Sequence, residues 1–247
     1  MSRYAILFPG QGSQRVGMGA DLFGPHGDLL GDPTDRIVGW SLERLVMDGP
    51  HEELTRTEYA QPALYAVSSA LWRAVDEAMP TGPAAAAGHS LGEYTALCAS
   101  GALTYEEGLA LVTERGRAMA AAAAEGEPSG MAALIGADLD LAESVAAVRR
   151  RDVGRLWFAN VNAPAQIGLA GSEADSAWLT AHARSLGIRR AVPLAVAGAF
   201  HSPFMQPAAQ RLEAALEAAS FAPPRFPVYA NTTARPTADP VGQLAEQ

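Results

Sequence analysis

The sequence contains one serine in a setting that is typical of a catalytic nucleophile. Gly88-His89-Ser90-Leu91-Gly92 matches the pattern GxSxG, in which small residues allow a strained turn that exposes the serine hydroxyl. A run of small residues precedes the motif and a helical pattern follows it, so the predicted context is strand, sharp turn and helix. The turn also leaves the next backbone N–H available to stabilise an oxyanion. The motif predicts nucleophilic catalysis by Ser90.

A serine hydroxyl needs a general base, and His201 is the best candidate among the five histidines. It lies in a predicted loop, Gly198 to Ser202, at which the chain would return from an inserted unit to the large core. The candidates between Ser90 and His201 for the acid of a triad fall at helix starts or in loops, where capping is their ordinary role: Asp138, Asp140, Asp152 and Asp175. We therefore predict a Ser-His dyad, which suffices when the leaving group is a thiolate.

Composition excludes several other kinds of chemistry. All 18 Lys+Arg residues are arginine, and 27 acids give a formal net charge of -9. Without lysine there can be no Schiff-base catalysis, no lysine-anchored pyridoxal phosphate and no Walker-type phosphate loop. The acidic balance argues against nucleic acid as a partner. The single Cys98 cannot form an intramolecular disulfide, and the histidine spacing predicts no metal site.

Neither end of the 247-residue chain suggests a membrane protein. The apolar run at the N-terminus ends at Pro9 without a cleavage-site pattern. No stretch approaches the ~18 uninterrupted apolar residues of a membrane span. We expect a cytoplasmic protein without a membrane partner.

The elements that would position Ser90 and His201 alternate as in an α/β protein. Tyr4 to Phe8 reads as a buried parallel strand, and Gly24 to Asp35 as an irregular connection. Apolar stripes predict helices in four places: around 42–46, and over 61–78, 105–124 and 205–219. A strand at 227–230 and a last helix near Pro240 complete this part.

The middle of the chain changes character. Strands are predicted at 131–137, 156–162, 166–170 and 190–196, with helices at 139–150 and 173–186. The order βαββαβ is that of a ferredoxin-like unit. Because it lies between two α/β-type stretches, we expect an inserted small domain.

Six segments, in order along nearly the whole chain, resemble the successive motifs of malonyl-CoA:acyl carrier protein transacylases, a family that includes the acyltransferases of polyketide synthases. The segments are FPGQGSQ at 8–14, TEYAQPAL at 57–64, GHSLGEY at 88–94, ERGRAM at 114–119, ANVNAPAQ at 159–166 and GAFHSP at 198–203. The resemblance implies an α/β-hydrolase-like large subdomain, residues 1–128 and 197–247, with a ferredoxin-like small subdomain, residues 129–196.

The resemblance also implies a ping-pong reaction. Ser90 would be acylated by malonyl-CoA with His201 as its base, and the phosphopantetheine thiol of an acyl carrier protein would take the malonyl group. No other cofactor is implied. The remaining roles carry over by position: an oxyanion hole from the amides of Gln11 and Leu91, a bidentate carboxylate anchor from Arg115, acyl-pocket walls from Met119 and Phe200, and a cleft lining from Asn160, Asn162 and Gln166.

Several interpretations stay open on the residues alone. Arg115 is either a solvated helix charge or, at the edge of an apolar stripe, a functional group. The arginines at 149–151, 155 and 189–190 are either solvated or a surface for the acidic carrier. Leu91 and Phe200 resemble the malonyl-selective rather than the methylmalonyl-selective pattern. A single methyl group allows discrimination between the two substrates of about 1 to 3 kcal/mol.

Two departures from the family pattern are expected to matter. The stretch from Gly24 to Gly39 is shorter than usual, which would alter the entrance near the Gln11 loop. The chain stops at Gln247, where family members continue into a segment that orients the catalytic histidine, so we expect a truncated or differently built end. Two rival functions are an acyl-carrier-protein acyl hydrolase of the same fold, which Arg115 argues against, and a non-catalytic carrier-binding module.

Overall fold

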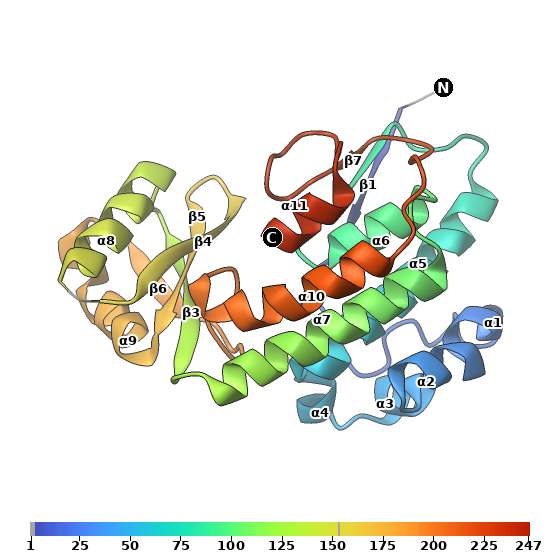
Figure 1. The fold of residues 1–247 in the computed structure, drawn as a ribbon, viewed down its shortest axis with the longest axis horizontal. Helices are drawn as coiled ribbons and strands as arrows, with labels where there is room; N and C mark the ends of the chain where they lie inside the picture. Colours follow the sequence, from blue (N-terminus) through green and yellow to red (C-terminus); the bar gives the residue numbers. More distant parts are fainter. Residues whose placement is uncertain (1–2, 153) are drawn as a thin grey trace. The chain divides into compact units, whose positions relative to one another are not determined.

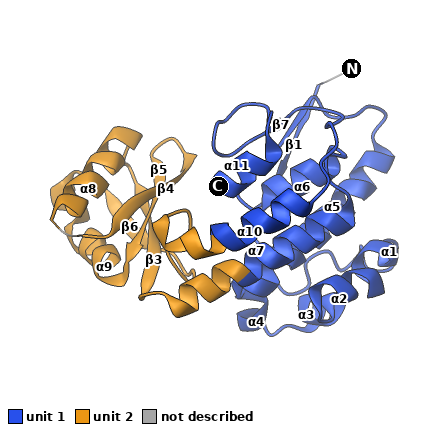
Figure 2. Ribbon diagram, in the orientation of Figure 1, with its two compact units in different colours: residues 1–117, 209–247 blue, residues 118–208 orange. Residues whose placement is uncertain are grey.

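The computed structural model describes residues 3–152 and 154–247 and divides into two compact units, shown in different colours in Figure 2. Unit 1 is formed by Met1–Arg117 and Ala209–Gln247, and unit 2 by Ala118–Ala208. Unit 2 is thus inserted into unit 1, and it is larger than the predicted 129–196. Its extra residues include Met119 and Phe200, which pack with Met131 in one apolar cluster.

Unit 1 contains a small sheet and most of the helices (Figure 1). Its strands are β1 (Ala5–Phe8), β2 (Ala85–Gly88) and β7 (Val228–Tyr229). Its helices are α1 (Gly27–Leu30), α2 (Asp32–Val38), α3 (Leu42–Asp48), α4 (His51–Thr55), α5 (Thr57–Ala78), α6 (Gly92–Ala99) and α11 (Pro240–Glu246). Helices α7 (Tyr105–Glu125) and α10 (Gln206–Ala218) contain the two boundaries between the units.

The sheet of unit 1 is parallel, with strand order β1-β2-β7. Phe8 and Val228 point into the main apolar cluster with residues of α6. The opposite face carries the cross-strand row Leu7, Ala87 and Tyr229, where Leu7 is 80% and Tyr229 41% exposed. The prediction of a buried strand at Tyr4 to Phe8 is therefore wrong on burial, because β1 is an edge strand with one face packed.

Helix α5 begins earlier than the sequence pattern indicated. Its first residue is Thr57 rather than Gln61, so Pro62 lies inside the helix. A proline there removes one intrahelical hydrogen bond, which burial of the early turns offsets: Thr57 is 1% and Ala60 0% exposed.

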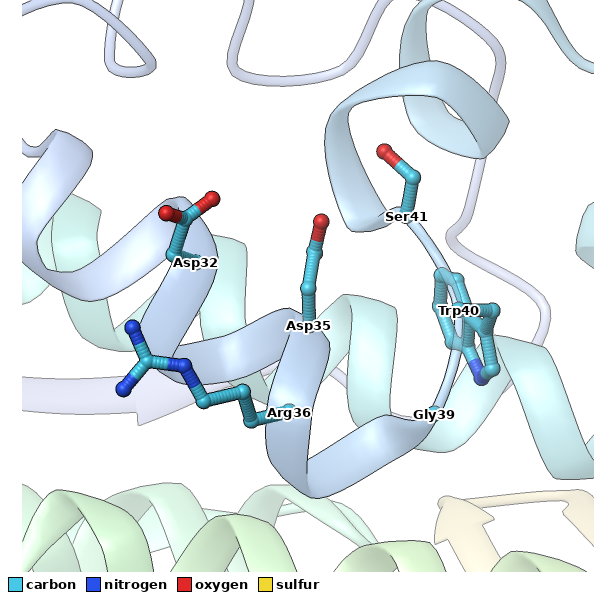
Figure 3. A pocket seen from close by; sticks show the side chains of 6 residues that line it. All are labelled: Asp32, Asp35, Arg36, Gly39, Trp40 and Ser41. Carbon is cyan, nitrogen blue, oxygen red and sulfur yellow. The ribbon is translucent and has the colours of Figure 1, made fainter.

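The connection after β1 is less irregular than expected, because it contains α1 and α2. Leu30 and Val38 are buried and anchor these helices, and Pro33 stands in the first turn of α2, where its missing N–H has no cost. A shallow pocket of about 410 Å³ lies beside Asp35 and Trp40, and Figure 3 shows the side chains that line it. Asp35 Oδ1 accepts the Leu42 N–H at 2.8 Å, so this carboxylate joins α2 to the start of α3.

Unit 2 contains the predicted ferredoxin-like unit. Its elements are β3 (Ser129–Ile135), α8 (Leu139–Arg151), β4 (Leu156–Ala163), β5 (Gln166–Ser172), α9 (Glu173–His182), a 3₁₀ turn (Ala183–Leu186) and β6 (Arg190–Pro193). The sheet is antiparallel with order β4-β5-β3-β6. That order and the βαββαβ sequence of elements confirm the ferredoxin-like prediction.

Asp175 stabilises unit 2 near the start of α9. The side chain is 3% exposed and accepts hydrogen bonds from Arg149 Nε at 2.6 Å, the Arg155 N–H at 2.5 Å and Ser172 Oγ at 2.6 Å. Burial alone would raise the pKa of Asp175, but these hydrogen bonds together lower it below the ordinary value for an aspartate. The folded state therefore binds fewer protons there than the unfolded state. Asp175 therefore contributes stability at neutral pH, and this is lost as the pH falls through the lowered pKa of the folded state.

Replacing Asp175 by asparagine is expected to lower the free energy of unfolding by about 2–3 kcal/mol at neutral pH, because an amide turns one acceptor oxygen into a donor that faces other donors. Urea unfolding at pH 7 and at about pH 3 measures this, and the variant should lose less stability on acidification than the native protein. Asp140→Asn, an exposed change on α8, is the control. Equal stability of the native protein and Asp175→Asn at pH 7 would contradict the assignment.

Candidate active site

The predicted nucleophile elbow is present between β2 and α6. Ser90 has φ 51°, the left-handed region that costs free energy for a residue with a side chain. The Gly92 N–H donates to His89 O at 2.9 Å and the Glu93 N–H to Ser90 O at 3.0 Å, which closes the turn. The two glycines of the motif are required by packing: a Cβ on Gly88 would lie 1.9 Å from Gly92 C, and one on Gly92 would lie 2.6 Å from Phe8 O.

Gly88→Ala is expected to disrupt the elbow, because the added Cβ meets backbone atoms that cannot move without opening the turn. We expect a loss of at least about 3 kcal/mol in the free energy of unfolding and loss of labelling of Ser90 by a serine-directed fluorophosphonate. Thermal unfolding and probe labelling measure the two effects. Gly82→Ala is the control, since a Cβ at Gly82 meets nothing within 4 Å. Native labelling of Gly88→Ala would show that the turn tolerates the methyl group.

The Gln11 loop lies directly against this elbow. The His89 N–H donates to Phe8 O at 3.0 Å, and a Cβ on Gly10 would lie 2.3 Å from His89 Nδ1. Gln11 itself is held by a hydrogen bond of 3.2 Å from its Nε2 to Thr57 Oγ1. Leu91 stands at the N-terminus of α6, where backbone N–H groups have no intrahelical acceptor. The loop and the helix start thus adjoin, as an oxyanion hole made by both would require.

Arg115 is buried beside the nucleophile. It is 5% exposed; its Nη1 donates to Gln61 Oε1 at 2.9 Å, and its Nη2 donates to Ser90 Oγ at 2.9 Å and to Gln247 Oε1 at 3.0 Å. Burial lowers the pKa of Arg115, but a guanidinium stays protonated in proteins. The interpretation of Arg115 as a solvated helix charge is therefore wrong, because this part of α7 faces the elbow.

Glu93 and Asn231, which the sequence patterns did not single out, adjoin Ser90 and Arg115. Glu93, in the first turn of α6, is 1% exposed and accepts hydrogen bonds from Asn231 and from Gln247 Nε2. Burial raises the pKa of Glu93, although the bonds from Asn231 and Gln247 and the charge of Arg115 oppose the rise. One signal was available: Glu93 is the single charged residue in the otherwise uncharged stretch GEYTALCA of α6.

The other predicted site residues lie in unit 2. Met119 and Phe200 belong to one cluster, at 7% and 5% exposed. His201 has φ 55° and lies in a loop closed locally by hydrogen bonds from the Phe200 N–H to Gly198 O at 3.0 Å and from Ser202 Oγ to Ala199 O at 2.5 Å. The walls predicted for an acyl pocket thus come together, and the local turn fixes the backbone of His201.

Asn160, Asn162 and Gln166 lie on the adjacent strands β4 and β5. Asn160 pairs with Gly168, whose lack of a side chain makes room for it: a Cβ there would lie 2.2 Å from Asn160 Oδ1. That oxygen is buried and has no hydrogen-bond partner among residues 3–152 and 154–247. Asn162 and Gln166 are exposed.

The described residues contain no helix that is long and apolar enough to cross a membrane.

Comparison with known proteins adds the decisive observation. A family model described as acyl transferase domain matches residues 6–245. The chain belongs to the acyl transferase family. Among curated acyl transferase relatives, the malonyl CoA-acyl carrier protein transacylase of Bacillus subtilis is 39% identical over 236 residues, covering 95% of this chain and 74% of the relative. The polyketide biosynthesis malonyl CoA-acyl carrier protein transacylase PksC of the same organism is 39% identical over 233 residues, covering 93% and 78%.

Solved acyl transferase structures share the fold. The malonyl CoA-acyl carrier protein transacylase of Coxiella burnetii has a TM-score of 0.92 and 32% identity, covering 99% of this chain and 78% of that one. A type II polyketide synthase malonyl-transacylase, solved in complex with its acyl-carrier protein, has a TM-score of 0.91 and 34% identity, covering 99% and 80%. The predicted fold class, an α/β-hydrolase-like core with a ferredoxin-like subdomain, is confirmed.

Proposed function

We propose that this acyl transferase moves a malonyl group from malonyl-CoA to the phosphopantetheine thiol of an acyl carrier protein through an ester on Ser90. One observation carries the proposal: the buried Arg115 guanidinium lies one hydrogen bond, 2.9 Å, from Ser90 Oγ. In a malonyl thioester, a single methylene separates the free carboxylate from the carbonyl carbon that the serine attacks. A cation directly beside the nucleophile is therefore where that carboxylate would bind.

Binding of the carboxylate would also release the nucleophile. A carboxylate can accept two parallel hydrogen bonds from a guanidinium, either from Nη1 and Nη2 or from Nε and Nη2. Both arrangements use an N–H of Nη2. Both Nη2 hydrogens of Arg115 already have acceptors, Ser90 Oγ and Gln247 Oε1. A malonyl carboxylate would displace at least one of them. Displacement of Ser90 Oγ would remove the Arg115 hydrogen bond from the oxygen that attacks the thioester carbonyl.

The first half-reaction acylates Ser90. Ser90 Oγ attacks the malonyl thioester carbon, and His201 takes the hydroxyl proton as general base. The amide N–H groups of Gln11 and Leu91 stabilise the oxyanion of the tetrahedral intermediate. CoA leaves as the thiolate and takes from His201 the proton that came from Ser90. Met119 and Phe200 line the acyl pocket, and Asn160, Asn162 and Gln166 line the cleft.

The second half-reaction repeats this chemistry with the carrier. The phosphopantetheine thiol gives its proton to His201 and attacks the Ser90 ester, and Ser90 Oγ leaves and is reprotonated. No cofactor other than the phosphopantetheine of the carrier is needed. These two substrates fit a cytoplasmic location.

The arginines of unit 2 are unequal candidates for binding an acidic carrier. Arg149 pairs with Asp175 at 2.6 Å, and Arg155 with Glu127 at 2.7 Å. Their charges are already compensated. We assign carrier binding to the exposed Arg151, Arg189 and Arg190.

The test is incubation with malonyl-CoA, with and without a phosphopantetheinylated carrier protein. We expect CoA release, a mass increase of one malonyl group on the peptide that contains Ser90, and transfer of that group to the carrier. Free malonate in place of malonyl-carrier would indicate a hydrolase. Carrier binding without acylation or CoA release would indicate a non-catalytic binding module.

A further inference from the structure

Asn231 and Glu93 have no role in the reaction described above, yet both contact the elbow. Asn231 follows β7 and lies 141 residues from Ser90 in the sequence, and its side-chain Oδ1 accepts the Ser90 N–H at 3.0 Å. Its Nδ2 donates to Gly88 O at 2.8 Å and to Glu93 Oε2 at 2.5 Å. One amide thus binds the backbone on both sides of His89, at the turn that presents the nucleophile.

The orientation of the Asn231 amide follows from its partners. The Ser90 N–H can only donate, so it requires the amide oxygen. Gly88 O and the Glu93 carboxylate can only accept, so they require the amide NH₂. The opposite orientation would lose all three hydrogen bonds. Glu93 also accepts the Asn231 backbone N–H at 2.9 Å, which holds the loop after β7 in place.

The elbow needs such support because Ser90 has φ 51°. A strained backbone conformation persists only where the surrounding structure enforces it. The bonds from the Ser90 N–H and to Gly88 O supply that constraint on the two sides of the turn.

The contacts continue into a closed ring. Glu93 Oε2 accepts from Gln247 Nε2 at 2.8 Å, and Gln247 Oε1 accepts from Arg115 Nη2 at 3.0 Å. The same Arg115 nitrogen donates to Ser90 Oγ at 2.9 Å. The ring therefore runs from the Ser90 N–H through Asn231, Glu93, Gln247 and Arg115 back to the Ser90 hydroxyl. The negative charge of Glu93 also partly balances the buried charge of Arg115.

We propose that Asn231 is a positioning residue that, with Glu93, holds Ser90 in its reactive conformation and links the nucleophile to Arg115 in one hydrogen-bonded ring. The identity of the acyl group rests on the proposed function, but the positioning of Ser90 does not. The test therefore uses a fluorophosphonate probe, which reacts with activated serines and needs neither a malonyl group nor a carrier.

The first variant is Asn231→Ala. The rate of probe labelling at Ser90 is expected to fall about 30- to 100-fold, because small misplacement of a reacting group costs about this much. Acylation at saturating malonyl-CoA should fall by a similar factor, and a melting temperature measured alongside shows that the variant is folded. Thr232→Ala, the adjacent exposed position, is the control and should label at the native rate. Native-rate labelling of Asn231→Ala would overturn the proposal.

The second variant, Asn231→Asp, keeps the size of the side chain. It tests the positioning role of Asn231 even if Asn231→Ala does not fold. It places a second carboxylate against Glu93, on which the charge of Arg115 also acts, and such a pair of carboxylates retains a proton at raised pH. Protonation restores a donor toward Glu93. The ratio of its labelling rate to the native rate should therefore rise at least about fivefold from pH 8 to pH 6. A ratio that stays constant with pH would overturn the proposal.

The two hypotheses fail in different ways. If native protein reacts with the probe but forms no malonyl ester, the proposed function fails, and the variants still test the positioning of Ser90. If native protein forms the malonyl ester and both variants match it, only the positioning role fails.

Discussion

Ser90→Ala is expected to abolish acyl transfer, with a fall in kcat of at least about 10⁴-fold. Removal of an activated serine leaves only the rate enhancement that binding and oxyanion stabilisation supply. The backbone hydrogen bond from residue 90 to Asn231 Oδ1 does not involve the hydroxyl, so the elbow should keep its shape and the protein its stability. Labelled malonyl-CoA measures the effect, since the variant should carry no covalent malonyl group.

The control for this prediction is Ser220→Ala. Ser220 is exposed, and its backbone N–H and its side chain both hydrogen-bond to Glu107 rather than to the elbow, so the alanine should label as the native protein does. Equal covalent labelling of Ser90→Ala and native protein would contradict the assignment of Ser90 as the acylated residue.

Arg115→Ala is expected to lower kcat/KM for malonyl-CoA about 10³-fold, with a far smaller effect on acetyl-CoA. A hydrogen bond to a charged group contributes about 1.5–3 kcal/mol, and a bidentate carboxylate contact makes two of them. An acetyl group has no carboxylate. The fall in kcat/KM for acetyl-CoA is therefore confined to the indirect effect on Ser90 Oγ, which Arg115 Nη2 contacts at 2.9 Å. The ratio of the two kcat/KM values separates the loss of carboxylate binding from general damage.

Arg117→Ala is a matched control on the same helix. Arg117 is exposed and donates to Val38 O at 2.7 Å, so its replacement removes the same charge without touching the elbow. We expect its preference for malonyl-CoA over acetyl-CoA to be native. An unchanged preference in Arg115→Ala would mean that the malonyl carboxylate binds elsewhere.

Local patterns predicted most of the secondary structure correctly, and the errors share one cause. The apolar run at Tyr4 to Phe8 forms a strand as expected, but its burial depends on what covers each face, and Leu7 is 80% exposed. The helices α1 and α2 were missed because glycine and proline are common in their sequence, whereas burial of Leu30 and Val38 stabilises them. Burial is a property of the packed elements, which a local pattern does not contain.

The sequence by itself determined the nucleophile elbow, because its glycines, its serine and the flanking strand and helix are adjacent in the chain and sterically require one another. The motifs also identified Arg115, though not its burial. Only the tertiary structure decided what surrounds these groups. Asn231 lies 138 residues from Glu93, and Gln247 lies 132 residues from Arg115. Hydrogen bonds depend on distance and direction in space rather than on separation along the chain, so the ring that joins Ser90 to Arg115 exists only in the folded protein.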